Sequence, residues 1–292
     1  MSQLEGADAD VWLPKLSLRK QLALLWCMSR GHSVEQMCDL ADVARETVQV
    51  LYRRFVLLVA EHQQTANDTQ KVGGCGVQYE ADEVAFRCKA ERDGTGLLKI
   101  LWIRYFGLVR RGSSKVLLAL LPDRLVRGSG QGGGGCLRIE ELSHALRADS
   151  TAPLLKEGSV LHTDSAKAYR KVGPQAWPAA GALQSNSHGA EPFSKHRWTH
   201  TNVTHKRKTG VPLRYVIKSE VVLPDGERLL VLKGTQKIDG YWASLRRLVG
   251  KLSVETGHSS YAARRGWLRA LVCAHQWRWL IVSGSAYDHR LS

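Results

Sequence analysis

The N-terminal part of the chain repeats its apolar residues with the three- and four-residue spacing of α-helices. The first run ends at Gly31, a residue type that commonly terminates helices. The next segment, Ser33-Val-Glu-Gln36, has the pattern of a capping box and predicts the start of a second helix. A third helix is predicted from roughly Val43 to Ala60. Residues 1–62 are therefore predicted to form an all-α segment.

The pattern changes from helices to strands after a polar segment. Residues 63–76 are polar and end in glycine, which is typical of a linker. Val77–Val84, Leu97–Val109 and Lys115–Leu121 then read as neighbouring strands, and their apolar runs predict a sheet covered on both faces. Later signals predict a helix at 139–147, strands at 158–162, 213–218 and 229–232, and helices at 236–252 and 260–281. The sequence thus predicts an α/β domain over residues 77–292.

The chain carries a large excess of positive charge. It has 42 basic and 27 acidic residues, which gives a formal net charge of +15. Such an excess favours binding to nucleic acids through release of counterions, although a basic surface without a partner is the alternative. No apolar run approaches the roughly 18 residues that a membrane-spanning helix needs. The scattered cysteines, without a CxxC pair, favour a reduced, intracellular protein over a disulfide framework or a zinc ribbon.

Three polar residues of the third predicted helix fall on one face. Arg45, Gln49 and Arg53 follow one another at four-residue spacing, away from the apolar face. A short helix, a tight turn and a longer helix with such residues form the layout of a helix-turn-helix. We therefore expect these three residues to bind DNA. A small helical bundle with a solvated basic face would give the same spacing.

Two aspartates stand where strands are predicted. Asp82 lies within the segment VQYEADEVAF, and Asp164 ends the segment SVLHTD. A buried carboxylate costs several kcal/mol unless it is paired or binds a metal. Each aspartate alone is most simply a hydrogen-bonded polar residue or a strand-end cap. Two of them in so basic a chain favour a metal site.

Helical spacing adds a third carboxylate near the C-terminus. Asp239 lies beside the apolar face of the helix predicted at 236–252, and Arg246 returns to the same edge seven residues later. Three acidic oxygen donors suit Mg²⁺ or Mn²⁺, and two such ions about 4 Å apart can promote phosphodiester cleavage. On this hypothesis Asp82 bridges both ions, while Asp164 and Asp239 hold one each. Arg246 would steady the attacked phosphate, unless Asp239 and Arg246 are ordinary surface residues.

In this order the residues resemble the DDE-type transposases of bacterial insertion sequences. The similarity lies in Tyr79-Glu-Ala-Asp-Glu83, Trp102-Ile-Arg-Tyr-Phe-Gly107, Leu161-His-Thr-Asp164, Val203-Thr-His205, Gly240-Tyr-Trp242 and His275-Gln-Trp-Arg278. It covers roughly residues 11–282, and the combination of motifs makes it specific. The branch concerned, with an ISXO-like transposase domain, has two aspartates, then Glu, Asn or His, and then a basic residue.

The resemblance implies a fold and a reaction. The fold would be RNase H-like, with a five-stranded mixed sheet flanked by helices. Water would cleave a phosphodiester at the end of a mobile element, and the freed 3′-hydroxyl would then attack target DNA in one site holding two Mg²⁺ or Mn²⁺ ions. The implied partner is double-stranded DNA, bound by a homodimer or a larger assembly. The location would be the nucleoid or cytoplasm of a prokaryote, or the nucleus of a eukaryote, with no membrane involved.

The resemblance also assigns site residues. Asp82 and Asp164 match the two aspartates of the family, and His205 matches a histidine of its Val-Asn-His stretch. Asp239 stands where Glu, Asn or His is usual, and Arg246 stands where Lys is usual. The family's N-terminal zinc ribbon has no counterpart, since no CxxC precedes the helices.

A basic stretch in the irregular region gives a further candidate surface. Lys206, Arg207 and Lys208, with Trp177 and Trp198 nearby, are expected to contact DNA, and a packed loop is the alternative for the two tryptophans. Two other functions stay open for the whole chain. One is a catalytically inactive, transposase-derived DNA-binding protein, and the other is an RNase H-like nuclease that cleaves without joining strands.

Overall fold

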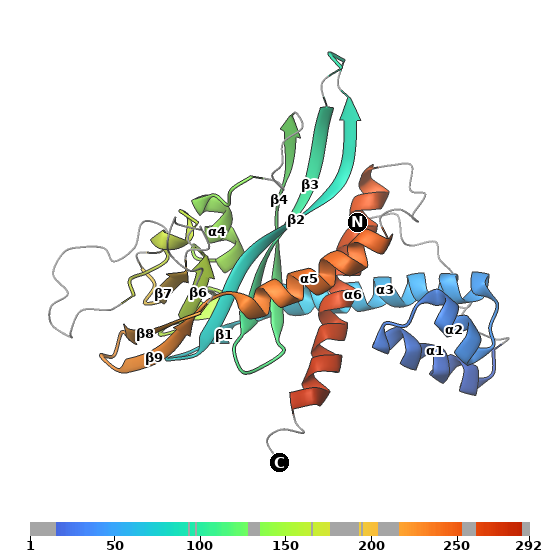
Figure 1. The fold of residues 1–292 in the computed structure, drawn as a ribbon, viewed down its shortest axis with the longest axis horizontal. Coiled ribbons are helices and arrows are strands. Elements are labelled where there is room, and N and C mark those ends of the chain that lie inside the picture. Colours follow the sequence, from blue (N-terminus) through green and yellow to red (C-terminus); the bar gives the residue numbers. More distant parts are fainter. Residues whose placement is uncertain are drawn as a thin grey trace, which may run out of the picture.

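A computed structural model describes residues 16–92, 94–96, 98–127, 135–164, 166–175, 193, 195–203, 216–252 and 261–287. Within these ranges the chain forms an N-terminal helical unit and a mixed sheet with helices on both faces (Figure 1). The helical unit consists of α1 (Leu18–Arg30), α2 (Val34–Ala41) and α3 (Arg45–Thr69). Its predicted caps are present, because Gly31 ends α1 in the left-handed conformation and Ser33 forms a capping box with Gln36.

The third helix is longer than predicted and takes up part of the expected linker at 63–76. It continues to Thr69, and its last turns pack against the C-terminal helix. Asn67 Nδ2 donates to Gln276 Oε1 at 2.9 Å, and Gln63 is buried. Polar residues at 63–76 predict a solvated linker, but among them Gln63 is buried and Asn67 forms a polar contact with α6 instead.

The central sheet has the strand order β4–β3–β2–β6–β7. Its strands are β2 (Gln78–Arg92), β3 (Leu98–Arg110), β4 (Val116–Arg127), β6 (Val160–Asp164) and β7 (Thr199–Val203). The first three are antiparallel neighbours, whereas β6 and β7 run parallel to β2. The expected five-stranded mixed sheet flanked by helices is confirmed.

Two small pairs of strands lie outside this sheet. The two-residue strands β1 (Val72–Gly73) and β5 (Leu155–Lys156) pair in parallel. The antiparallel pair β8 (Ile217–Val222) and β9 (Arg228–Lys233) leads directly into the next helix. This hairpin therefore positions the start of that helix beside the sheet.

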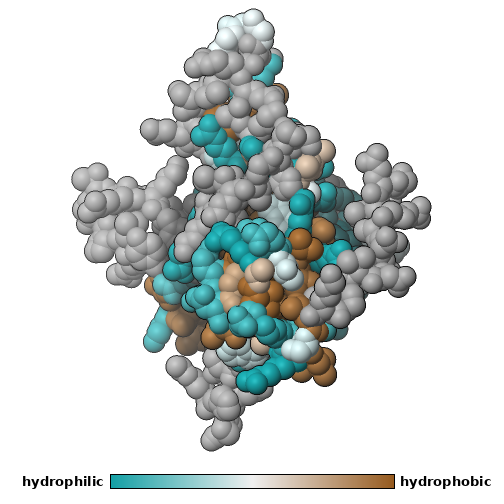
Figure 2. Space-filling model, turned by 90° about the vertical axis from the view of Figure 1, so that its right-hand side faces the viewer, coloured by the Kyte–Doolittle hydropathy of each residue, from teal (hydrophilic) through white to brown (hydrophobic). Residues whose placement is uncertain are grey.

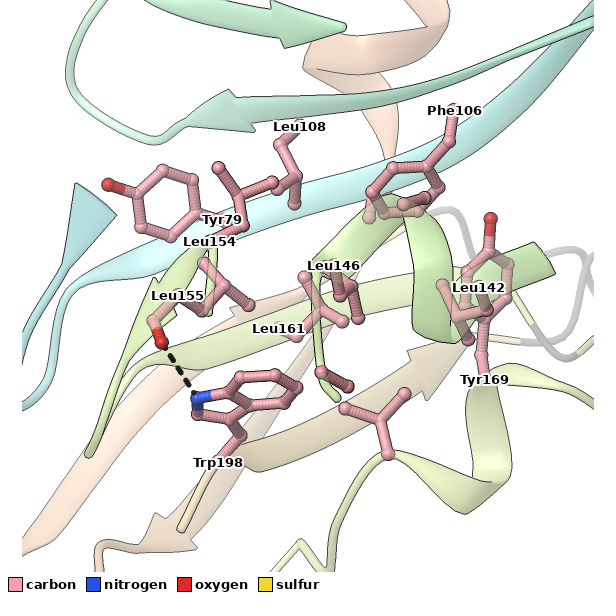
Figure 3. Packing of buried hydrophobic residues seen from close by; sticks show 14 of the residues in the cluster. Tyr79, Phe106, Leu108, Leu142, Leu146, Leu154, Leu155, Leu161, Tyr169 and Trp198 are labelled. Carbon is pink, nitrogen blue, oxygen red and sulfur yellow. Dashed lines mark hydrogen bonds between the residues drawn. The ribbon is translucent and has the colours of Figure 1, made fainter. Parts of the chain in front are cut away.

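One face of the sheet carries α4 (Ile139–Leu146) and a large apolar core (Figure 3). Phe106 and Leu108 from β3 meet Leu161 from β6 in this core. Trp198 is fully buried there, and its indole Nε1 donates to the Leu155 carbonyl at 3.2 Å. The expected DNA contact of Trp198 is therefore wrong, because burial leaves its ring no surface to offer. Trp177 lies outside the described residues.

The opposite face is covered by α5 (Gln236–Leu252) and α6 (Tyr261–Tyr287) (Figure 1). Ile238, Trp242 and Leu245 of α5 form the core of this face with residues of β2 and β3. The bounds of α5 are those predicted, because its apolar residues keep a strict helical spacing. This helix carries Asp239, so its position on the sheet decides where the third aspartate lies.

The helical unit packs on α6 and shares a hydrophobic core with it. Ala270, Leu271 and Ala274 of α6 join the buried residues of α1 to α3 in a single cluster. Apolar side chains also remain on the outside of the helical unit, where Figure 2 shows them grouped among hydrophilic ones. Leu18, Leu22, Trp26, Leu40, Val50 and Leu58 are each more than half exposed.

None of the described helices has the length and apolar character to cross a membrane. All six cysteines are free thiols.

Candidate active site

Asp82 and Asp164 come from neighbouring parallel strands in the middle of the sheet. In the register of β2 and β6, Tyr79 pairs with Leu161 and Glu80 with His162. Continuing this register by two residues places Asp82 level with Asp164. Because residues level on adjacent parallel strands point to the same face, the two carboxylates lie side by side. The turn after β6 holds Asp164, whose Oδ1 accepts from the Ala166 amide at 2.9 Å.

Asp239 reaches this place from the first turn of α5. Its backbone amide donates to the Thr235 carbonyl at 2.9 Å, and its Oδ2 accepts from Thr235 Oγ1 at 3.1 Å. Asp82 is opposite Gly107 in the pairing of β2 with β3. A Cβ on Gly107 would lie 2.5 Å from Cζ2 of Trp242, so the indole rests directly on the glycine. The missing side chain lets α5 approach the sheet at the level of Asp82.

Glu80 holds the start of α5 against β2. Its Oε2 accepts from the backbone amides of Lys237 at 2.6 Å and Ile238 at 3.2 Å, the unpaired donors at a helix N-terminus. Its Oε1 accepts from Arg111 Nε at 2.9 Å. Glu80 is only 5 % exposed and stands two residues before Asp82, on the same face of the strand. It therefore fixes the position of Asp239 relative to the other two aspartates.

The electrostatic environment of Asp82 is acidic. Burial is the main reason that its pKa lies well above the ordinary value, and the charges of Glu83, Asp164 and Asp239 raise it further. Within the part of the chain that the structure describes, the charged neighbours that act on this carboxyl are thus negative. A divalent cation would offset both the burial and the repulsion. The three oxygen donors suit a hard ion such as Mg²⁺ or Mn²⁺, so the residues fit the expected metal.

The three aspartates are spread more widely than a single-ion cage. Among the described residues, the group whose ligand atoms all lie within 4.8 Å of one another is Cys75, Asp225 and Glu227. These three are exposed, and the Cys75 thiol already donates to Asp225 Oδ2 at 2.9 Å. A site for two ions about 4 Å apart would need no such closeness, because Asp164 and Asp239 would each hold a different ion.

Glu83 is a fourth carboxylate near the site that the sequence reasoning missed. Its Oε2 accepts from Tyr169 Oη at 2.6 Å on the face of the sheet that carries α4. Burial raises its pKa, and the charge of Asp164 adds to this rise. The residue is adjacent to Asp82 and is part of the same motif, so no separate signal in the sequence marked it.

Arg246, the predicted basic residue of the site, stands apart from Asp239. Arg246 is exposed and makes no ion pair within the described part of the chain. It lies seven residues beyond Asp239 on α5, about 10 Å along the helix axis. That distance excludes a direct pair and leaves the guanidinium free for a bound phosphate. His205, Lys206, Arg207 and Lys208 lie outside the described residues.

The predicted DNA-binding residues of α3 face the rest of the protein. Arg45 Nη1 lies 2.9 Å from Glu35 Oε1, and Arg45 and Gln49 both line a cleft between the helical unit and α5 and α6. The guanidinium of Arg53 lies over the Trp267 ring of α6, 5.7 Å from its centroid. All three residues remain exposed. The structure thus places Arg45 and Gln49 beside a cleft and Arg53 against α6. Their contact with DNA stays a prediction.

Known proteins add no family to this picture. No protein-family model matches the chain, and no curated protein matches it.

Proposed function

We propose that the chain is a DDE-type transposase, a metal-dependent enzyme that cleaves DNA at the ends of a mobile element and joins it to target DNA. The supporting observation is that the register of β2 with β6 brings Asp82 level with Asp164. The charges of Asp164 and Asp239 both raise the pKa of Asp82. On this proposal the five-stranded mixed sheet is RNase H-like, and its two central aspartates stand on adjacent parallel strands.

The chain's own residues have defined parts in the reaction. Asp82, Asp164 and Asp239 would hold two Mg²⁺ or Mn²⁺ ions, which activate the attacking group and stabilise the leaving oxygen when bound. Glu80 and Gly107 keep α5 close to β2 and thereby orient Asp239. Arg246, further along the same helix edge, would contact the DNA phosphate beside the cleaved bond.

The partner on this proposal is double-stranded DNA, as element end and as target. The net charge of +15 supports binding to DNA by release of counterions. Joining two ends calls for a homodimer or a larger assembly on DNA, located with the genome inside the cell. Arg45, Gln49 and Arg53 remain candidate DNA contacts.

The first prediction concerns the two central aspartates. Asp82→Asn and Asp164→Asn should each lower the rate at which supercoiled plasmid is nicked in Mg²⁺ or Mn²⁺ by roughly 100-fold or more, because an amide is a poor ligand for these ions. Asp39→Asn, on an exposed residue of α2, is the matched control and should nick normally. Binding of a labelled duplex in EDTA should be equal in all four proteins.

The outcomes separate the candidate functions. Tight DNA binding without nicking in any divalent ion would contradict the enzyme and support a DNA-binding protein without catalysis. Nicking without strand-transfer products on DNA with free 3′ ends would support a nuclease that does not join strands. Equal nicking by wild type and Asp82→Asn would exclude the proposed site.

A further inference from the structure

A cleft of about 830 Å³ separates the helical unit from the two helices that cover the sheet. Three helices contribute one face each: Arg45, Gln49 and Tyr52 from α3, Ser244, Arg247 and Leu248 from α5, and His275, Arg278 and Trp279 from α6. The turn between α1 and α2, beginning at Arg30, closes one side. This volume lies within the range of known ligand sites. The cleft is therefore large enough for a segment of a bound polymer.

The charge of this cleft is positive. Its lining contains four arginines, Arg30, Arg45, Arg247 and Arg278, against a single acidic residue, Glu35. Glu35 is already paired with Arg45. Within the described part of the chain, Arg30 and Arg247 are exposed and have no acidic partner. Two guanidinium groups on opposite walls are thus left to bind an anion.

The floor of the cleft holds buried polar atoms that lack partners. His275 and Arg278 are each 8 % exposed, and neither His275 Nδ1 nor Arg278 Nε has a hydrogen-bond partner. One other nitrogen of each side chain has a partner: His275 Nε2 lies 3.0 Å from Ser244 Oγ, and Arg278 Nη2 donates to Tyr52 Oη at 3.0 Å. Buried polar atoms without partners cost stability, which favours a role for these two residues beyond packing.

We propose that this cleft binds the phosphate backbone of DNA, with Arg30 and Arg247 contacting phosphates from opposite walls. Planar guanidinium groups suit phosphate oxygens, and Arg30 and Arg247 both line the cleft with exposed side chains. Because α5 carries both Arg247 and Asp239, a strand in the cleft would be positioned relative to the three aspartates. The identity of the polyanion as DNA rests on the proposed function, whereas the site itself rests on the cleft.

The test is a binding measurement that needs no catalysis. Fluorescence anisotropy of a labelled 20-base-pair duplex in EDTA compares wild type with the double variant Arg30→Ala/Arg247→Ala over a range of salt concentrations. We expect affinity to fall about tenfold or more, and the slope of log K against log salt to fall by about 1.8, since each lost phosphate contact contributes about 0.9. Arg19→Ala/Arg87→Ala, which removes two exposed arginines outside the cleft, is matched in charge and should change the slope little.

Each result decides between stated alternatives. Equal losses in the two double variants would overturn the proposal, because net charge alone would then explain binding. Displacement of the duplex by 1 mM ATP, a free nucleotide with the same phosphate chemistry, would also overturn the assignment to DNA. Thermal unfolding of both double variants must match wild type, and their exposed positions make this the expected result. A further result would separate the two proposals. If the cleft variant loses DNA binding while wild type nicks no DNA, the proposed enzymatic function is contradicted and the binding site in the cleft is supported.

Discussion

On the proposed function, Asp239 is one of two residues, with Arg246, at which the site differs from the usual DDE-type pattern. A glutamate at this position would extend the carboxylate by one methylene towards Asp82. Asp239 already uses one oxygen to accept from Thr235, within its own helical turn. One carboxylate oxygen of this short side chain therefore binds Thr235, and the other is left for the site.

This argument predicts a gain of function. Asp239→Glu should nick plasmid faster than wild type, by roughly tenfold or more, because a displacement of about 1 Å can cost about 100-fold in rate. Asp239→Ala should nick more slowly than wild type. Rates are measured under single-turnover conditions, so that product release does not mask the effect. A slower Asp239→Glu variant with normal DNA affinity would show that the aspartate side chain already has the length that the site requires.

At this scale the sequence reveals residues whose type conflicts with their surroundings. Asp82 and Asp164 stand out because a carboxylate buried in a strand is costly unless it is paired or binds a metal. Glu80 stands in the same motif as Asp82, yet its contact with the amides of Lys237 and Ile238 joins segments distant in the chain. For Trp198 the sequence predicts a contact with DNA and the structure shows burial. Its sequence neighbours are basic and are predicted to be irregular, whereas its side chain is fully buried. Long-range partners of this kind leave no local pattern.

At the scale of elements, the fit between α5 and the sheet depends on Gly107. Gly107→Ala should lower the free energy of unfolding by about 1–3 kcal/mol, because the new methyl group would clash with the Trp242 indole. It should also slow nicking by moving Asp239. Gly240→Ala is the matched control on the same helix, where nothing lies within 4 Å of a new Cβ, and should raise stability by about 0.5–1 kcal/mol. Urea denaturation measures both, and equal stability of the two variants would contradict the close packing.

Element boundaries follow the sequence where one periodicity dominates. The range predicted for α5 is the range observed, since its apolar residues all face one core. In α1 the sequence predicts the helix but does not single out its buried face. Leu24, Cys27 and Met28 are buried, whereas Leu22 and Trp26 are largely exposed. When a helix has apolar residues on most sides, its sequence does not reveal which side is buried. In α1 the packing on α6 determines the buried side.

At the scale of the whole molecule, the helical unit and the α/β part are joined through α6. Residues of α6 belong to the core of the helical unit as well as to the cover of the sheet. Gln276 makes this connection specific: its Nε2 donates to the Val116 carbonyl of β4 at 2.8 Å and to Asn67 Oδ1 of α3 at 2.7 Å. Both parts of the molecule thus meet on one helix, and the cleft with Arg30 and Arg247 lies along that junction.

The shared core predicts that the α/β part does not fold well alone. Residues 77–292 expressed without the helical unit would expose Ala270, Leu271 and Ala274 and leave Gln276 without Asn67. We expect this fragment to be insoluble or to lack a cooperative urea transition by circular dichroism, whereas the whole chain unfolds in a single transition. Co-expression of residues 1–76 as a separate chain should restore solubility, because it resupplies the missing surface. A soluble fragment with the transition midpoint of the whole chain would instead mean that the helical unit is an independent attachment, and that the cleft between them is not a fixed site.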